Sequence, residues 1–255
     1  MKAILTSSIG GSVKVKGRRI PIPLMGENGQ LDKMKAFWRK NSRILLISAS
    51  PDDYARNDGM INCFKESFNM SGLSFSLFTL CDARTEETVE QLSEMDVILI
   101  AGGHVPTQNA FMERIGLKER LRKYEGLIIA WSAGSMNCAE MVYAGPESEE
   151  EAINPDYQRW ISGLGLTKVN ILPHFQSIKE ETLGGLRVIE DITYADSIGH
   201  EILALNDGSY IVVDKGTETL FGEAYSIKDG CQKQICRNGE SIILDRDVDE
   251  LDNLA

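Results

Sequence analysis

One serine lies in a pattern that is typical of a catalytic nucleophile. Ser132 follows the apolar run LIIA (residues 127–130) and a tryptophan, and the small residues AGS come after it. A short, partly β-branched apolar run predicts a buried strand, and small residues behind it allow a sharp turn into a helix. The pattern therefore predicts a nucleophile elbow, which exposes the serine hydroxyl. Because Ala130 replaces the first glycine of the G-x-S-x-G motif, an ordinary hydroxyl in a tight loop stays an open alternative.

Only three histidines are available as the base that accepts a serine proton. His174 ends the segment LPH after an apolar run, and His104 follows two glycines after the run VILIA. His200, between glycine and glutamate, is typical of a surface turn. For each histidine alone an ordinary packed or polar role stays open. Two of the three histidines are nevertheless expected at strand ends near Ser132. Because functional residues gather on the loops at strand ends, this placement indicates a functional site.

Backbone N–H groups that can stabilise an oxyanion are expected at two strand ends. Gly102 and Gly103 end one predicted strand, and Ala133 begins the helix after Ser132. Glycine permits the close approach and the unusual dihedral angles that an oxyanion hole needs. A tight turn that binds no ligand is the alternative interpretation of the two glycines.

The elements that position these residues alternate between strands and helices. Apolar runs predict strands at 2–8, 43–50, 73–82, 96–103 and 126–132, and amphipathic segments predict helices at 31–41, 53–72, 85–95 and 107–125. This alternation predicts an α/β fold with a mainly parallel sheet flanked by helices on both faces. In such sheets ligands bind beyond the carboxyl ends of the strands, where Ser132 and His104 are expected.

The sequence after residue 145 has a different character. An acidic, irregular connection leads to a further strand that ends at His174, and a helical stretch is predicted at 176–197. Beyond residue 200 the strand patterning is broken by turn signals such as NDG and KDG. We expect antiparallel C-terminal strands that extend the same sheet. Since no repeat or linker divides the sequence, a single domain over 1–255 is expected.

Composition and charge argue against several kinds of partner. The formal net charge of −11 disfavours nucleic acids and anionic membranes, because both require a basic surface. No apolar run approaches the roughly 20 residues of a membrane-spanning helix. The single basic cluster, within the loop expected at 10–30, is interpreted as a solvated segment. The alternative is that it supplies a cation to a ligand carboxylate.

The cysteines favour a reducing compartment. Five cysteines with irregular spacing do not form a disulfide framework. The N-terminal apolar stretch is too short for the core of a signal peptide, so a cytoplasmic location is expected. Cys231 and Cys236 find no obvious co-ligands among three histidines, so neither a metal nor another cofactor is expected. A homodimer stays an open alternative to a monomer.

Three short segments resemble one family of serine peptidases. WSAG at 131–134, preceded by an aliphatic strand, resembles the nucleophile motif of the aspartyl dipeptidase (dipeptidase E) family. NILPHF at 170–175 is similar to that family's histidine segment, and AGGH at 101–104 stands where the family has a glycine-rich loop. The resemblance covers most of the chain in the order of elements. It implies a class I glutamine amidotransferase-like fold in which serine replaces the cysteine.

The resemblance also implies roles for individual residues. Ser132 is the implied nucleophile and His174 the implied general base, and then acid. The N–H of Ala133 with that of Gly102 or Gly103 is the implied oxyanion hole. His104 replaces a polar residue that commonly follows the family's glycines, which makes it a candidate substrate contact.

The acid that orients the histidine is left open by the resemblance. Dipeptidases place an aspartate where this sequence has Glu147. Cyanophycinases, which belong to the same wider group, use a glutamate slightly later, which favours Glu150. Glu149 lies between the two candidates, and most of these acids are also expected in a solvated charge run.

The implied function is a serine-type exopeptidase that hydrolyses short peptides, with N-terminal aspartate as a candidate preference, through an acyl-enzyme. Such a substrate needs a cation, for which the candidates are Arg18, Arg19, Arg56 and Arg187. Two alternatives stay open: a cyanophycinase-like β-aspartyl peptidase, and an amidotransferase-like binding domain with a silent site. A glutaminase is disfavoured because the elbow holds a serine.

Overall fold

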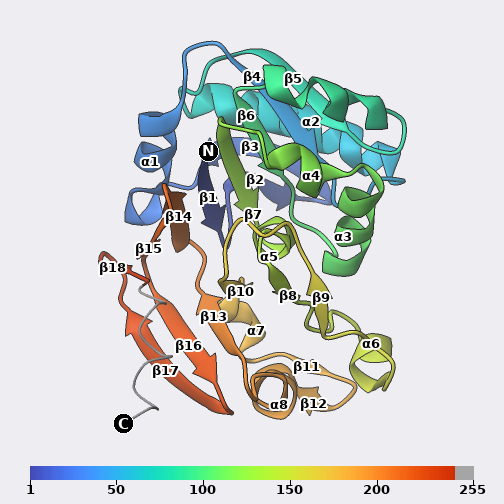
Figure 1. Cartoon of the computed structure of the whole chain (residues 1–255), viewed down its shortest axis with the longest axis vertical. Coiled ribbons are helices and arrows are strands. Elements are labelled where there is room, and N and C mark those ends of the chain that lie inside the picture. Colours follow the sequence, from blue (N-terminus) through green and yellow to red (C-terminus); the bar gives the residue numbers. More distant parts are fainter. Residues whose placement is uncertain (245–255) are drawn as a thin grey trace.

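A central eight-stranded sheet forms the upper part of the molecule (Figure 1). The computed structural model describes residues 1–244. Five strands pair in parallel in the order β1-β7-β6-β4-β5. They are β1 (Lys2–Thr6), β4 (Ser42–Ile47), β5 (Phe75–Cys81), β6 (Val97–Ile100) and β7 (Leu127–Trp131). All five coincide with runs that the sequence predicts as strands, except that β4 begins one residue earlier, at Ser42. Strands β6 and β7 are buried at every position, as expected for central strands.

Helices cover both faces of this sheet, so the predicted α/β class is confirmed. One face carries α1 (Gln30–Phe37), which follows the short 3-10 helix η1 (Glu27–Gly29), and α2 (Tyr54–Met70); the other carries the 3-10 helix η2 (Glu86–Glu94), α3 (Val105–Arg114) and α4 (Leu117–Leu121). Alternate residues of β4 separate the two cores: Ile44 packs with Met34 and Phe68, whereas Leu45 packs with Leu92. This division follows from the two-residue period of a strand.

The C-terminal strands divide between two sheets. As predicted, three antiparallel strands extend the central sheet beyond β1, namely β14 (Tyr210–Asp214), β15 (Thr217–Phe221) and β18 (Ser241–Ile243). The others form a second sheet in the lower part of Figure 1, with β10 (Asn170–Leu172), β13 (Glu201–Leu205), β16 (Ala224–Lys228) and β17 (Cys231–Cys236). The expectation of one continuous sheet was therefore wrong. Strand patterning specifies which face is buried but not which neighbour a strand pairs with.

Several local predictions also differ from the structure. The loop expected at 10–30 is a hairpin of β2 (Gly10–Val15) and β3 (Arg18–Leu24), whose turn residues Lys16 and Gly17 both have positive φ. The long helix expected at 107–125 is divided at Gly116, which has a φ of 62°. The predicted α-helix at 85–95 is a 3-10 helix, and Thr85 does not cap it with its side chain.

The remaining elements lie in the middle and lower parts of the view in Figure 1. They are α5 (Ala133–Asn137), β8 (Met141–Tyr143), α6 (Glu149–Ile153), β9 (Trp160–Ser162), α7 (Phe175–Ile178), β11 (Thr182–Leu183), β12 (Leu186–Arg187), the π-helix η3 (Val188–Thr193) and α8 (Tyr194–Asp196). The helix predicted at 176–197 is thus interrupted by a small hairpin. No helix in residues 1–244 is both long enough and apolar enough to span a membrane.

Candidate active site

Ser132 occupies a strained turn between β7 and α5. Its φ of 51° and ψ of −125° are sparsely populated by residues other than glycine. The backbone is held there because the Ser132 N–H faces the carbonyl oxygens of Thr6 and Ser7 at 3.1 and 3.2 Å. A side chain on Gly134 would come within 2.2 Å of the Ile100 carbonyl oxygen, so the turn requires glycine two residues later. The structure thus has the strand-turn-helix geometry of a nucleophile elbow.

His174 faces this serine from the end of β10. Its Nε2 lies 3.0 Å from Ser132 Oγ, within hydrogen-bonding distance. The residue adopts a left-handed conformation with a φ of 58° at the start of α7. Its backbone N–H donates to Ser7 Oγ at 2.8 Å, which anchors the turn to the end of β1. A base in this position can accept the Ser132 proton.

The carboxylate on the other side of the imidazole is Asp207, which lies 2.7 Å from His174 Nδ1 through Oδ1. Our expectation of a glutamate after Gly145 in this position was therefore wrong. Glu149 and Glu150 are exposed on the first turn of α6, where Ser148 caps the helix. Glu147 does approach the site, but it makes no hydrogen bond to His174.

The turn that carries Asp207 joins β13 of the second sheet to β14 of the central sheet. Ser7 Oγ donates to Asp207 Oδ1 at 2.8 Å, and the Asp207 N–H donates to Gln176 Oε1 at 2.9 Å. Partial burial acts to raise the pKa of Asp207, but the contacts with His174, Ser7 and Gln176 outweigh it and hold the pKa below the usual value. The carboxylate can therefore orient His174 and stabilise its protonated form. In the sequence, the NDG turn is the one signal that indicates Asp207.

Two backbone N–H groups are available for an oxyanion. Within residues 1–244 the N–H groups of Gly103 and Ala133 have no hydrogen-bond partner, and both residues line the pocket at Ser132. A side chain on Gly103 would come within 2.6 Å of the Ala49 Cβ, and one on Gly102 within 2.9 Å of the Ser132 Cβ. The glycines are thus required for the close packing of this strand end, and the free donors can stabilise a developing negative charge.

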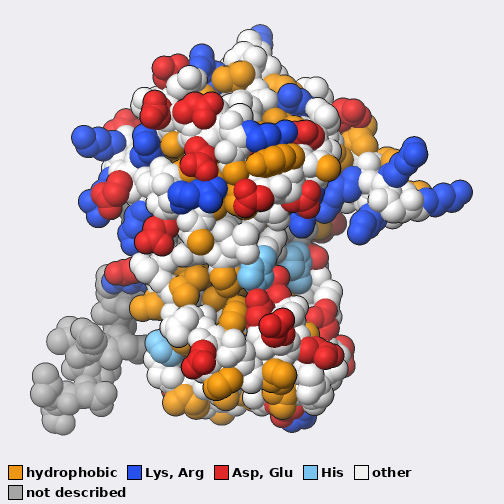
Figure 2. Space-filling view, turned by 90° about the vertical axis from the view of Figure 1, so that its right-hand side faces the viewer, with side chains coloured by type: hydrophobic (Ala, Val, Ile, Leu, Met, Phe, Trp, Pro, Cys, Tyr) orange, Lys and Arg blue, Asp and Glu red, His pale blue; other side chains and the backbone are white. Residues whose placement is uncertain are grey.

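His104 is held by side chains rather than left free for a substrate. Its Nδ1 lies 2.7 Å from Thr107 Oγ1 and its Nε2 lies 2.8 Å from Glu151 Oε1. This pair joins the start of α3 to α6. Figure 2 shows two histidines in the waist between the upper and lower parts of the molecule, with acidic side chains directly beneath them.

Two pockets meet at Ser132. They share Gly103, Ser132, Glu147 and His174. The pocket that we call the apolar pocket is lined further by Tyr143, Leu172, Ile178, Leu183 and Val188, with Glu181 as an acidic member. The pocket that we call the arginine pocket is lined further by Ser8, Ser12, Arg19, Arg56, His104 and Trp131.

The structure separates the four candidate cations. Arg19 and Arg56 line the arginine pocket, whereas Arg18 and Arg187 line neither pocket. Arg187 pairs with Asp191 through two hydrogen bonds from its guanidinium group, at 2.6 and 2.9 Å. Arg56 forms no ion pair with any residue in the described part of the chain, so its charge is available to a ligand.

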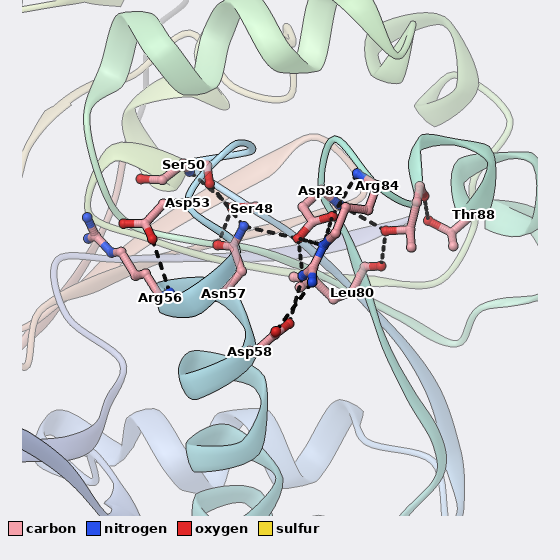
Figure 3. A network of polar contacts seen from close by, with 11 residues as sticks. Ser48, Ser50, Asp53, Arg56, Asn57, Asp58, Leu80, Asp82, Arg84 and Thr88 are labelled. Atoms are coloured by element: carbon pink, nitrogen blue, oxygen red, sulfur yellow. Dashed lines mark hydrogen bonds and ion pairs between the residues drawn. The ribbon is translucent and has the colours of Figure 1, made fainter.

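A buried polar network fixes the end of α2 from which Arg56 projects (Figure 3). Asn57 accepts from Ser48 Oγ at 2.8 Å and donates to Asp82 Oδ2 at 3.2 Å. Arg84 binds the same Asp82 carboxylate at 2.7 Å. Figure 3 shows the Arg56 side chain pointing away from this network. The network therefore fixes the N-terminal end of α2, and this position allows the Arg56 guanidinium group to line the arginine pocket.

Replacing Asn57 with leucine is expected to lower the free energy of unfolding by about 1–3 kcal/mol, because it leaves Ser48 and Asp82 with unsatisfied buried groups. Burial opposes ionisation of Asp82, but the bonds from Arg84 and Asn57 hold its pKa below the usual value. The folded state therefore binds fewer protons than the unfolded chain, and the contribution of Asp82 to stability is lost as the pH falls through its folded pKa.

Urea unfolding of Asn57→Leu at pH 7 measures the effect. The matched control is Asn62→Leu on the exposed face of the same helix, which is expected to change stability by less than about 0.5 kcal/mol. Equal losses in the two variants would show that the network does not contribute to stability.

Comparison with known proteins identifies the family. Residues 26–221, more than half of the chain, match the model of peptidase family S51. The chain belongs to peptidase family S51. Among curated proteins no significant sequence match is found. The protein is thus a serine peptidase, as the sequence predicted.

The fold of this S51 peptidase is also found in a solved structure. A protein of Listeria monocytogenes EGD-e that carries a provisional assignment as peptidase E superposes with a TM-score of 0.54. The two chains are 14% identical, and the match covers 92% of this chain and 98% of the other. At 14% identity the likeness supports the fold alone, so the roles of the site residues rest on their geometry in this structure.

Proposed function

We propose that this S51 peptidase is a serine exopeptidase that removes an N-terminal acidic residue from short peptides. The observation that carries the proposal is the Ser132–His174–Asp207 arrangement, which opens between the arginine pocket and the apolar pocket. A nucleophile with its base and orienting acid accounts for the hydrolysis. The two pockets account for the choice of residues on either side of the scissile bond.

In the proposed reaction Ser132 Oγ attacks the scissile carbonyl carbon while His174 Nε2 takes its proton. The negative charge on the carbonyl oxygen is stabilised by the N–H groups of Gly103 and Ala133. His174 then gives the proton to the leaving amine as the C–N bond breaks, which leaves an acyl-enzyme. A water molecule, deprotonated by His174, hydrolyses the ester and returns Ser132 to its starting form.

The arginine pocket supports an acidic residue on the acyl side of the bond. Arg56 has no ion-pair partner in residues 1–244, and the Arg19 guanidinium group donates to Ser12 Oγ at 2.9 Å, which holds it at the pocket wall. Arginine binds carboxylates with strong charge-assisted bonds. The apolar pocket suits the side chain of the leaving residue, such as leucine.

The substrate preference is tested by replacing Arg56 with glutamine. For Asp-Leu we expect kcat/KM to fall by about 10- to 100-fold, the value of one lost bond to a charged group. For the neutral dipeptide Asn-Leu we expect little change. Arg122→Gln, at an exposed site outside both pockets, is the matched control. An equal fall for Asp-Leu and Asn-Leu would contradict the assignment of Arg56 to the acidic side chain.

A cyanophycinase-like β-aspartyl peptidase is the second candidate function. Glu181 in the wall of the apolar pocket supports it, because an acidic group there can pair with a leaving arginine. Including β-Asp-Arg beside Asp-Leu in the same kinetic panel distinguishes the two. A preference for β-Asp-Arg that is lost in Glu181→Gln would select the second function.

A cytoplasmic location also stays a proposal. It is supported by the five cysteines, all of which are free thiols and four of which are buried. Proteins that keep unpaired thiols are typical of reducing compartments.

A further inference from the structure

Glu147 lies at the junction of the two pockets and has no role in the mechanism described above. It lines the arginine pocket and the apolar pocket together with Ser132 and His174. Among the described residues that line the arginine pocket it is the one acidic side chain. Because Asp207 occupies the Nδ1 side of His174, the Glu147 carboxylate is not needed to orient the base.

The backbone of Glu147 is fixed while its carboxylate is mostly unpaired. The Glu147 N–H donates to Glu151 Oε2 at 2.8 Å, and Glu151 Oε1 in turn lies 2.8 Å from His104 Nε2. The carboxylate accepts one long hydrogen bond, from the Val105 N–H to Oε1 at 3.4 Å. Within residues 1–244 its Oε2 has no hydrogen-bond partner. The structure therefore holds this residue in place and leaves one oxygen open to a ligand.

Within residues 1–244 no lysine or arginine forms an ion pair with Glu147. The nearby histidines are engaged elsewhere, His104 with Glu151 and His174 with Asp207. The surrounding protein atoms raise the pKa of Glu147, although the residue is exposed at the pocket rim, and the charge of Glu151 acts in the same direction. The two histidines act in the opposite direction. A bound cation would remove the resulting cost of keeping the carboxylate ionised.

The chemistry of an exopeptidase substrate places a cation at this position. The α-ammonium group is two bonds from the scissile carbonyl carbon, so it must lie close to Ser132 when that carbon is attacked. A carboxylate that binds it must therefore line the wall beside the nucleophile. Glu147 meets this requirement, because it lines both pockets together with Ser132. Glu181 lines the apolar pocket but not the arginine pocket.

We propose that the Glu147 carboxylate binds the α-ammonium group of the substrate's N-terminal residue and so restricts the enzyme to peptides with a free N-terminus. This inference rests on the proposed peptidase function and adds the residue that recognises the chain end. The charge pair forms in the ground state and in the transition state, so its loss raises KM more than it lowers kcat.

The test compares Asp-Leu with N-acetyl-Asp-Leu, which has no ammonium group, in the wild type and in Glu147→Gln. For the wild type we expect kcat/KM to be at least 100-fold higher on the free dipeptide. For Glu147→Gln we expect a fall of about 10- to 100-fold on Asp-Leu and little change on the acetylated peptide. Glu147→Asp, which keeps the charge, should restore much of the discrimination. Glu149→Gln, exposed on α6 and outside both pockets, should behave as the wild type.

Each outcome decides between the proposals. Equal losses on both peptides in Glu147→Gln, or a wild type that cleaves both equally well, would overturn the recognition of the ammonium group and leave the peptidase function standing. A wild type that cleaves neither peptide would overturn the proposed substrate class, and the role of Glu147 with it.

Discussion

Replacing Ser132 with alanine is expected to lower kcat on Asp-Leu by about a million-fold, because no acyl-enzyme can form. The variant should fold normally. The strained backbone of residue 132 is held by bonds from its N–H to the end of β1, and among the described residues the hydroxyl is bound by His174 alone. Residual hydrolysis would come from the oxyanion donors and from substrate binding. Steady-state kinetics with a circular dichroism spectrum of each variant provides the measurement.

Labelling by a fluorophosphonate probe gives a second readout for the same serine. The wild type should form one adduct on Ser132, and Ser132→Ala should form none. Ser177→Ala, an exposed serine one turn after His174 that lines neither pocket, is the control and should keep full labelling. Hydrolysis that persists in Ser132→Ala would contradict the assignment of the nucleophile. An unlabelled wild-type protein would instead favour a silent binding domain.

Replacing Asp207 with asparagine is expected to lower kcat by about 10⁴-fold with little change in KM. The amide preserves the size of the side chain but removes the charge that stabilises protonated His174. It also offers an N–H where the carboxylate accepted a hydrogen bond, which favours the wrong tautomer of the imidazole. Ser7 Oγ contacts the same atom, Oδ1, at 2.8 Å, and its hydroxyl can accept from the amide N–H instead of donating to the carboxylate. The bond from the Asp207 backbone N–H to Gln176 Oε1 does not depend on the substitution, so the turn should stay in place.

The control for Asp207 is Glu150→Gln, which removes a carboxylate that the sequence made a candidate for the same role. Glu150 is exposed on α6 and lines neither pocket, so this variant should retain the wild-type kcat. If Glu150→Gln lost activity while Asp207→Asn kept it, the orienting acid would have to be reassigned.

The sequence identified the residues whose neighbours along the chain explain them. Ser132 was found because a buried strand, a turn of small residues and a helix follow one another within about ten positions. His174 was found because it ends a short strand after a proline. In both cases the local pattern indicates the turn, and bonds to the end of β1 then hold the backbone in place.

Asp207 and Ser7 could not be found in this way. Asp207 reaches His174 because the chain passes from the second sheet to the central sheet at a single turn. Sequence patterns do not specify that pairing of strands, since β13 and β14 have the same kind of apolar sequence. Ser7 ends β1, whose place between β7 and β14 is likewise a long-range property. The acidic run at 147–151 is more conspicuous in the sequence, and it drew attention to the wrong carboxylates.

Two other differences between the predicted and the observed elements have a signal in the sequence. The Lys16-Gly17 pair, flanked by residues with alternating character, is a two-residue hairpin turn in which both positions have positive φ. Gly116 within the predicted long helix marked the point at which α3 ends and α4 begins.

The residues at the end of β1 connect the whole site. The carbonyl oxygens of Thr6 and Ser7 hold the N–H of Ser132, and the Ser7 hydroxyl contacts both the His174 N–H and the Asp207 carboxylate. These partners come from chain segments more than 120 residues away, and they meet only when the N-terminal strand is inserted between β7 and β14. A growing chain therefore has no competent site until β14 has been made and paired with β1. We therefore expect a chain that lacks β1 or β14 to have no peptidase activity, even when Ser132 and His174 are both present.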